Sequence, residues 1–249
     1  MTEFVKPILK KTIIPILLFI RRVIEIIQTY AIPKKTFKTS LPFEMYQEES
    51  VKRSYDYFKE YFPKCVFLEK SEIQKFALNK SLESDSEQNF LYLEFGVFNG
   101  DSLNLFADNL RTKIYGFDSF EGLKEDWLGT SLQKGFFNLY GKIPKLRNNA
   151  IPIKGWVQDT LLEFLKSNTN KINFIHMDLD TYDSCKYVLE KIKPQLTDNC
   201  IILFDELYNY GGWENGEVKA LEETFAKNEY KFLAFGANSQ QAVIQLVKK

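Results

Sequence analysis

From Asn89 to the end of the chain, short apolar runs alternate with segments whose apolar residues recur at helical spacing. The apolar runs predict seven strands, at 90–95, 113–118, 150–153, 172–177, 200–204, 230–235 and 242–247. The periodic segments between them predict helices, at 102–110, 160–167, 184–192 and 217–227. This alternation is typical of a mainly parallel α/β sheet with helices on both faces. The close spacing of the last two strands predicts an antiparallel hairpin.

The first 88 residues have a different pattern, and we expect three segments: 1–40, 41–88 and 89–249. Residues 13–27 are apolar and amphipathic but too short for a membrane span, which needs about 20 apolar residues. We expect this helix to pack on the main domain or on a second subunit of a homodimer. Peripheral membrane contact through residues 8–27 is the alternative. Apolar residues at three-to-four spacing predict a helical extension over 41–88, with Pro63 ending one run.

A long stretch at 123–149 has no clear period, and we expect a loop or lid there, which in a compact domain is often functional.

The composition of the chain excludes several classes of partner and site. Lys plus Arg and Asp plus Glu balance at 33 each, so no global positive field favours nucleic acid as a partner. The three cysteines form no C-x-x-C pair, which disfavours disulfides and zinc and favours a reducing cytoplasm. No convincing secretory signal is present, and His176 is the single histidine.

A glycine turn follows the first strand of the main domain, where ligands of open α/β sheets bind. Gly96 permits a sharp turn, and Gly100 lets the next helix approach closely. About 20 residues further on, Asp118 stands where an acid accepts hydrogen bonds from ribose hydroxyls. An ordinary tight turn explains each feature alone, but the pair favours a nucleoside-type cofactor.

The later strands end in further candidate chemistry. Trp156 and Gln158 follow the third strand, where the indole could stack on an adenine ring or belong to the core. Two more strands, which we expect to be neighbours, are followed by acids at 178, 180, 205 and 206. Clustered carboxylates repel one another unless a cation or proton is present, and their oxygens suit Mg²⁺. Helix N-caps would explain one acid per strand end but explain four less well.

Four segments together resemble the macrocin O-methyltransferase group of class I methyltransferases: 94–100, 115–123, 176–184 and 203–213. This family of macrolide and aminocoumarin tailoring enzymes has relatives in bacterial surface-polysaccharide clusters. The resemblance covers roughly residues 89–247. It implies a Rossmann-like sheet of seven strands, mostly parallel with one antiparallel strand, that binds S-adenosylmethionine over the glycine turn.

The resemblance also implies the site residues. The cofactor positions are Glu94, Gly96, Val97, Phe98, Gly100, Asp118, Ser119, Phe120, Trp156, Gln158 and Asp178. The Mg²⁺ positions are Asp178, Asp205 and Glu206, and the first two are the expected catalytic residues. Glu206 departs from the family pattern, in which Asp or Asn is usual. Weaker candidates for contacts with the acceptor are Asp180, Tyr182, Tyr208, Tyr210 and Trp213.

The expected reaction is methyl transfer to a hydroxyl of a small molecule, a sugar or a surface-glycan precursor. N-methylation and metal-independent transfer on the same fold are alternatives. No general base is assigned, because Thr181 stands where catechol-type relatives have a lysine and His176 is expected inside its strand. A dehydrogenase would need a third glycine in the turn. A membrane-associated scaffold with a vestigial cofactor site is the alternative from another functional class.

Overall fold

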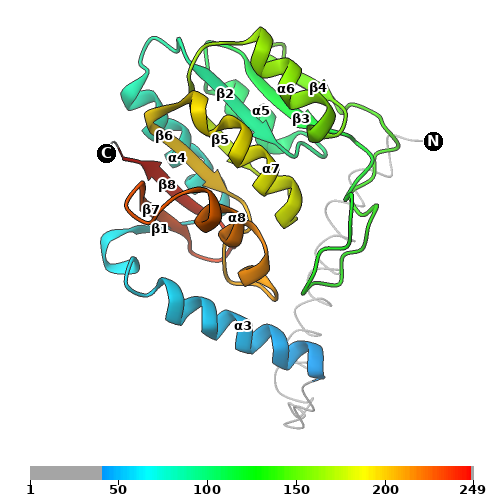
Figure 1. Cartoon of the computed structure of the whole chain (residues 1–249), viewed down its shortest axis with the longest axis vertical. Coiled ribbons are helices and arrows are strands. Elements are labelled where there is room, and N and C mark those ends of the chain that lie inside the picture. Colours follow the sequence, from blue (N-terminus) through cyan, green and yellow to red (C-terminus); the bar gives the residue numbers. More distant parts are fainter. Residues whose placement is uncertain (1–40, 248–249) are drawn as a thin grey trace, which may run out of the picture. The chain divides into compact units, whose positions relative to one another are not determined.

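An eight-stranded sheet forms the centre of the protein in a computed structural model that describes residues 41–247 (Figure 1). The strand order is β1-β7-β8-β6-β5-β2-β3-β4. β8 pairs antiparallel with both β6 and β7, and the other pairs are parallel. The strands are β1 (Val66–Leu68), β2 (Leu91–Phe95), β3 (Ile114–Asp118), β4 (Ala150–Lys154), β5 (Ile172–Met177), β6 (Leu196–Phe204), β7 (Tyr230–Gly236) and β8 (Ala242–Leu246). The predicted α/β fold, its antiparallel strand and the last hairpin are therefore confirmed.

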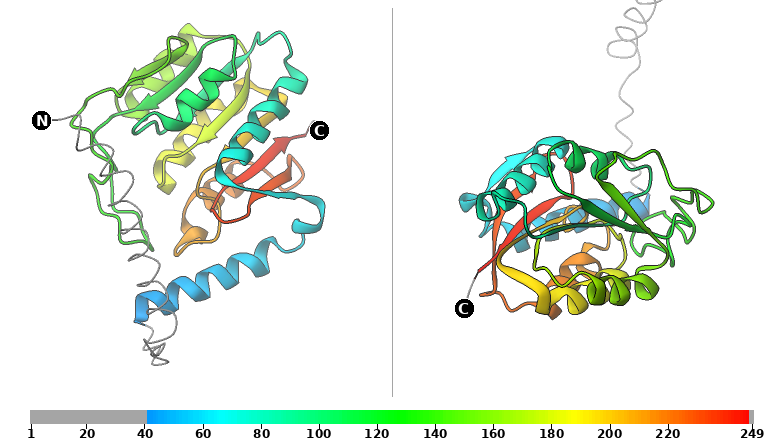
Figure 2. Two further views of the ribbon diagram at one scale, coloured as in Figure 1. Left: turned by 180° about the vertical axis from the view of Figure 1, so that it is seen from behind. Right: turned by 90° about the horizontal axis from the view of Figure 1, so that it is seen from above.

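Helices cover both faces of the sheet (Figures 1 and 2). Their apolar sides enter two separate clusters of buried residues, one shared by α6, α7 and α8 and the other by α4 and α5. Two clusters arise because successive strand residues point to opposite faces, so each face needs its own cover. The helices are α3 (Pro42–Phe58), α4 (Lys70–Ser84), α5 (Asp101–Asp108), α6 (Val157–Ser167), α7 (Tyr182–Ile192) and α8 (Glu217–Thr224), with 3-10 turns η2 (Phe62–Lys64), η3 (Lys193–Gln195) and η4 (Trp213–Asn215).

The extension before β2 differs in part from the helical segment that we expected over 41–88. α3 ends at Phe58, Pro63 lies in η2, and β1 then pairs with the edge of β7. Three residues are too few to show a strand period, which is why the sequence does not predict β1. The chain from Glu44 onward forms one compact unit, and β1 makes the extension part of the sheet.

The stretch expected to be a lid contains no helix or regular strand between β3 and β4. Backbone bonds shape it: Leu123 N–H donates to Phe136 O, and Gly141 N–H donates to Phe120 O. Within residues 41–247, no helix has the length and apolarity needed to cross a membrane. The helix predicted at 13–27 lies outside the described residues.

Candidate active site

The carboxyl ends of the central strands open into a cavity of about 740 Å³, within the range of about 300–1,000 Å³ that is typical of ligand sites. Its wall combines the glycine turn, the lid, the acids after β5 and β6, and the start of α4. The expected site residues that line it are Gly96, Val97, Phe98, Asp118, Ser119, Trp156, Gln158, Asp178, Asp180, Asp205 and Glu206.

Gly96 joins the glycine turn to the end of β5. Its φ is +89°, and a Cβ at this position would lie 1.7 Å from the backbone oxygen of Asp178. The same junction is held by the Asp178 N–H, which donates to Phe95 O at 2.8 Å. Only glycine satisfies both the left-handed backbone and this close approach. The turn and Asp178 are therefore fixed in one geometry.

Asp118 holds the turn from the neighbouring strand. One carboxylate oxygen accepts the N–H groups of Val97 and Phe98, each at 2.8 Å, and the other accepts the Phe120 N–H at 2.6 Å. A carboxylate offers about four lone-pair sites, so roughly one remains for a ligand hydroxyl. Asp118 thus shapes the cofactor end of the cavity and still faces it.

Three of the expected cofactor residues lie behind this wall instead of on it. Glu94 is fully buried, where its carboxylate accepts hydrogen bonds from Ser102 and from His176 Nδ1–H. Gly100 faces lid side chains, and the Phe120 ring is 1% exposed in the core. These residues support the wall from behind, and their contact with the cofactor stays a prediction.

Lid side chains close over the cofactor end. Lys124 Nζ lies 5.6 Å from the ring centroid of Trp156 and donates to Gln158 Oε1 at 3.1 Å. Phe137 of the lid meets Phe98 of the glycine turn edge to face, with ring centroids 5.2 Å apart. Aromatic and cationic groups of this kind can cover a flat ring while excluding water from it.

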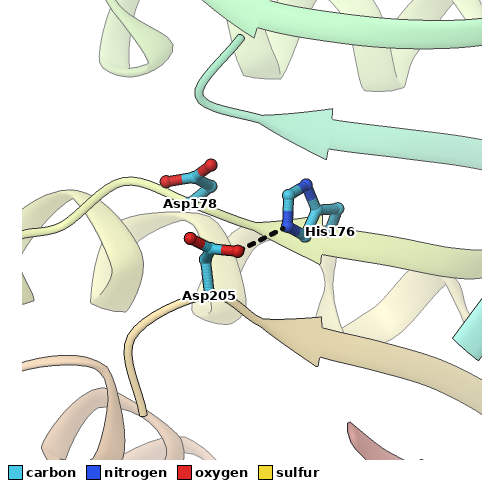
Figure 3. Close-up of side chains that lie close together, drawn as sticks. All are labelled: His176, Asp178 and Asp205. Carbon is cyan, nitrogen blue, oxygen red and sulfur yellow. Dashed lines mark ion pairs between the residues drawn. The ribbon is translucent and has the colours of Figure 1, made fainter. Parts of the chain in front are cut away.

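The carboxylates after β5 and β6 gather at the other end, as the parallel pairing of these strands predicts. Ligand atoms of Asp178, Asp180 and Glu206 lie within 4.8 Å of one another, and so do those of His176, Asp178 and Asp205. Figure 3 shows the second group, with His176 Nε2 facing Asp205 Oδ1 at 3.5 Å. Two overlapping sets thus share Asp178.

Asp205 is held by partners on three elements. Lys70 Nζ lies 2.9 Å from Oδ2, and Gln241 Nε2 donates to Oδ1, which also faces His176. Burial alone would raise the pKa of Asp205, but hydrogen bonds with His176 and Glu206 and the positive charges of His176 and Lys70 hold this pKa well below its usual range. Burial would lower the pKa of His176, yet its hydrogen bonds to Asp205 and Glu94 raise it to about 10. Both pKa shifts favour an ion pair between Asp205 and His176.

The pKa values of the remaining acids shift in the opposite direction, upward. Burial, and then the charge of Asp205, raise the pKa values of Asp178 and Glu206 well above the usual range. Burial and the same charge raise the pKa of Asp180 to about 8. Glu206 Oε2 is buried without a hydrogen-bond partner among residues 41–247. An oxygen-rich cluster whose acids cannot all ionise unaided, with one unpaired oxygen among them, fits a hard divalent cation.

The sequence pattern does not identify two of these partners. Lys70 is the first residue of α4, where a positive charge is unfavourable to the helix dipole, and that position is the only available signal. Gln241 precedes β8, so its proximity to the end of β6 follows once β8 is known to pair with β6.

Two of the residues expected to contact the acceptor make hydrogen bonds within the protein, and their contact with the acceptor stays a prediction. Tyr208 donates its hydroxyl to Gly236 O at 2.7 Å, and Trp213 donates its indole N–H to Ser50 O at 3.1 Å. Both are core residues, 6% and 3% exposed. By contrast, Tyr182 and Tyr210 line a smaller cavity that adjoins the first.

Comparisons with known proteins agree with this geometry. Residues 93–207 match the model of a protein family described as a methyltransferase domain. CalS11, a calicheamicin methyltransferase, superposes with a TM-score of 0.57 at 21% identity, covering 86% of this chain and 96% of its own. Its apo form, described as a TDP-rhamnose 3'-O-methyltransferase, gives a TM-score of 0.52 at 21% identity and coverages of 90% and 91%.

The O-methyltransferase NovP gives a TM-score of 0.52 at 16% identity, covering 72% of this chain and 79% of its own. No curated protein matches the chain in sequence. At these identities the solved structures establish the fold, while the family match covers the glycine turn, Asp118 and the acids after β5 and β6. The match of residues 93–207 and the shared fold therefore identify the protein as a methyltransferase.

Proposed function

We propose that this enzyme transfers the methyl group of S-adenosylmethionine to a hydroxyl of a small molecule, a sugar or a surface-glycan precursor. We further propose that it is a member of the macrocin O-methyltransferase group. One observation carries the proposal: a single cavity has the glycine turn with Asp118 at one end and the carboxylates of Asp178 and Asp205 at the other. A donor and a chelated acceptor would therefore meet inside it. The description of CalS11 as a sugar O-methyltransferase supports the acceptor class.

We further propose that Mg²⁺ is held by Asp178, Asp205 and Glu206. Asp178 lies close to Asp205 in one group and close to Glu206 in the other, where Asp180 is the third member and could replace Asp205. The unpaired Glu206 oxygen supports this assignment despite the family's preference for a shorter side chain. The ion would supply positive charge that lowers the pKa of the attacked hydroxyl and fixes its position.

The chain's own residues then align the two reactants. The Gly96 junction fixes Asp178 against the glycine turn, so the cofactor end and the carboxylate end keep one separation. Lys70 and Gln241 orient Asp205, and lid residues line the cofactor end. Because a methyl sulfonium is a reactive donor, alignment supplies most of what the reaction needs.

Two measurements test this function. S-adenosylhomocysteine should bind by calorimetry, and Asp118→Ala should weaken that binding while Asp108→Ala, on the far side of α5, should not. Production of S-adenosylhomocysteine with a panel of hydroxylated acceptors should be lost in excess EDTA and restored by Mg²⁺. Undiminished turnover in EDTA would contradict the metal, and absence of cofactor binding would contradict the whole proposal.

The three cysteines lie within the described residues and are unpaired. The reducing cytoplasm expected from the sequence stays a prediction. The homodimer and peripheral membrane contact through residues 8–27 stay predictions.

A further inference from the structure

The lid and the end of β4 carry positive charge that no acid of the same stretch balances. The whole chain has a net charge of zero, yet residues 127–158 contain no acid and five basic residues: Lys134, Lys142, Lys145, Arg147 and Lys154. Arg147 is neutralised by a bidentate ion pair with Asp108, and the backbone N–H of Lys134 donates to Asp126. The other three lysines are exposed, and none of them forms an ion pair with another residue of 41–247.

Exposed apolar side chains stand among these lysines. Tyr140 is 84% exposed and Ile143 is 46% exposed. Phe136, four residues before Tyr140, is also exposed and meets Phe137 edge to face, with ring centroids 4.7 Å apart. Phe137 in turn lines the cofactor cavity and contacts Phe98 of the glycine turn. Clustered exposed apolar residues mark interaction sites, and this cluster borders the cavity.

Hydrogen bonds to three other segments hold this part of the lid. The Gly141 N–H donates to Phe120 O at 2.8 Å, and Lys154 Nζ donates to Gly141 O at 2.6 Å, which places Lys154 beside Lys142. The Asn104 side chain on α5 donates to the backbone oxygen of residue 145 at 3.0 Å. A partner would therefore meet a surface that is already ordered, which lowers the entropic cost of binding.

The mixture of charge and apolar surface decides which partner fits. In a symmetric dimer through this surface, the two-fold axis would bring the same lysines against one another, and like charges repel. A soluble polyanion would pair with the lysines but leave Ile143 in water. An anionic lipid surface offers phosphates to the lysines and an apolar layer to Tyr140 and Ile143.

We propose that the lid docks the enzyme on an anionic lipid surface through a docking face of six residues: Phe136, Tyr140, Lys142, Ile143, Lys145 and Lys154. Tyrosine is favoured at the headgroup level of a bilayer, and each lysine near an anionic surface strengthens binding about fivefold. Docking brings the cofactor cavity to the membrane surface. It uses a different part of the chain from residues 8–27, and it does not depend on which acceptor the enzyme methylates.

A fluorescent label on the docking face tests this contact without interference from other parts of the chain. Tyr140→Cys is labelled with nitrobenzoxadiazole in full-length protein that carries Cys65→Ser, because Cys185 and Cys200 are fully buried. Vesicles of phosphatidylcholine with about one third phosphatidylglycerol should shift the emission to shorter wavelength, and vesicles of phosphatidylcholine alone should not. The same label on Ser167→Cys, at the exposed end of α6, should not respond to either.

Matched charge reversals identify the lysines responsible. Lys142→Glu combined with Lys145→Glu should raise the concentration of anionic vesicles needed for a half-maximal response at label 140 by at least about tenfold. Lys113→Glu combined with Lys166→Glu changes the net charge equally, at exposed positions before β3 and near the end of α6, and should have little effect. Circular dichroism confirms that each variant is folded, and calorimetry with S-adenosylhomocysteine should give unchanged affinity, because none of these residues lines the cavity.

The proposal is overturned if label 140 does not respond, if it responds equally to vesicles without phosphatidylglycerol, or if label 167 responds as strongly. Equal weakening by the two pairs of charge reversals would also overturn it. A label at 140 that is already shielded in buffer would show that a second copy or another segment covers the docking face, and an equal response to soluble polyglutamate would indicate an acidic protein as the partner. Either result contradicts lipid docking, while the calorimetry reports cofactor binding separately.

Discussion

Gly96→Ala should disrupt the contact between the glycine turn and Asp178. The structure gives the expected loss of unfolding free energy. The residue would need a left-handed backbone, which costs an alanine about 1–2 kcal/mol. Its Cβ would also lie 1.7 Å from the Asp178 oxygen, far inside the 3.0 Å limit that real contacts respect. The turn must therefore separate from Asp178 by more than about 1 Å.

That separation breaks two backbone hydrogen bonds, from Gly96 N–H to Phe117 O and from Asp178 N–H to Phe95 O. Each contributes about 0.5–1.5 kcal/mol, so the free energy of unfolding should fall by about 2–5 kcal/mol in total. Gly135→Ala is the matched control, because its φ is +81° but nothing lies within 4 Å of its added Cβ.

Urea unfolding followed by circular dichroism measures both variants, and calorimetry measures their affinity for S-adenosylhomocysteine. Gly135→Ala should lose only about 1–2 kcal/mol of unfolding free energy. Gly96→Ala should lose more and should also weaken cofactor binding by at least about tenfold, since the displaced turn carries Val97 and Phe98. Equal losses of stability in the two variants would refute the steric argument.

Asp205→Asn should abolish turnover and leave S-adenosylhomocysteine affinity nearly unchanged, because this side chain lies at the carboxylate end; a parallel fall in affinity would contradict that placement. Lys70→Met should tighten Mn²⁺ binding, measured by electron paramagnetic resonance, by about 3- to 10-fold, an effect limited by the solvent exposure of Lys70. Equal tightening in Lys75→Met, on the exposed side of α4, would indicate only a change in net charge. Gln47→Ala should speed proteolysis of the lid, because Gln47 donates to Gly129 O and accepts from the loop after β6; unchanged cleavage would show that other contacts hold the lid.

Much of the site could be predicted from the sequence because its residues directly follow the central strands of the sheet. In a parallel sheet the residues that follow each strand meet at one edge, so Asp118, Asp178 and Asp205 need only correct strand assignments to be brought together. The same logic fails for residues that lie inside a strand or behind a turn. Glu94 and Phe120 belong to the predicted motifs, yet packing directs both side chains away from the cavity.

The sequence by itself determined the alternation of strands and helices, the glycine turn and the gathering of acids, because each depends on local periodicity or on parallel strand ends. Tertiary structure alone decided that β1 joins the sheet and that Lys70 reaches Asp205 across 135 positions of the chain. It also decided that Tyr208 and Trp213 lie in the core while Tyr210 lines the smaller cavity. These outcomes depend on contacts between distant segments, and no local pattern of side chains encodes which of several aromatic residues will find a buried partner.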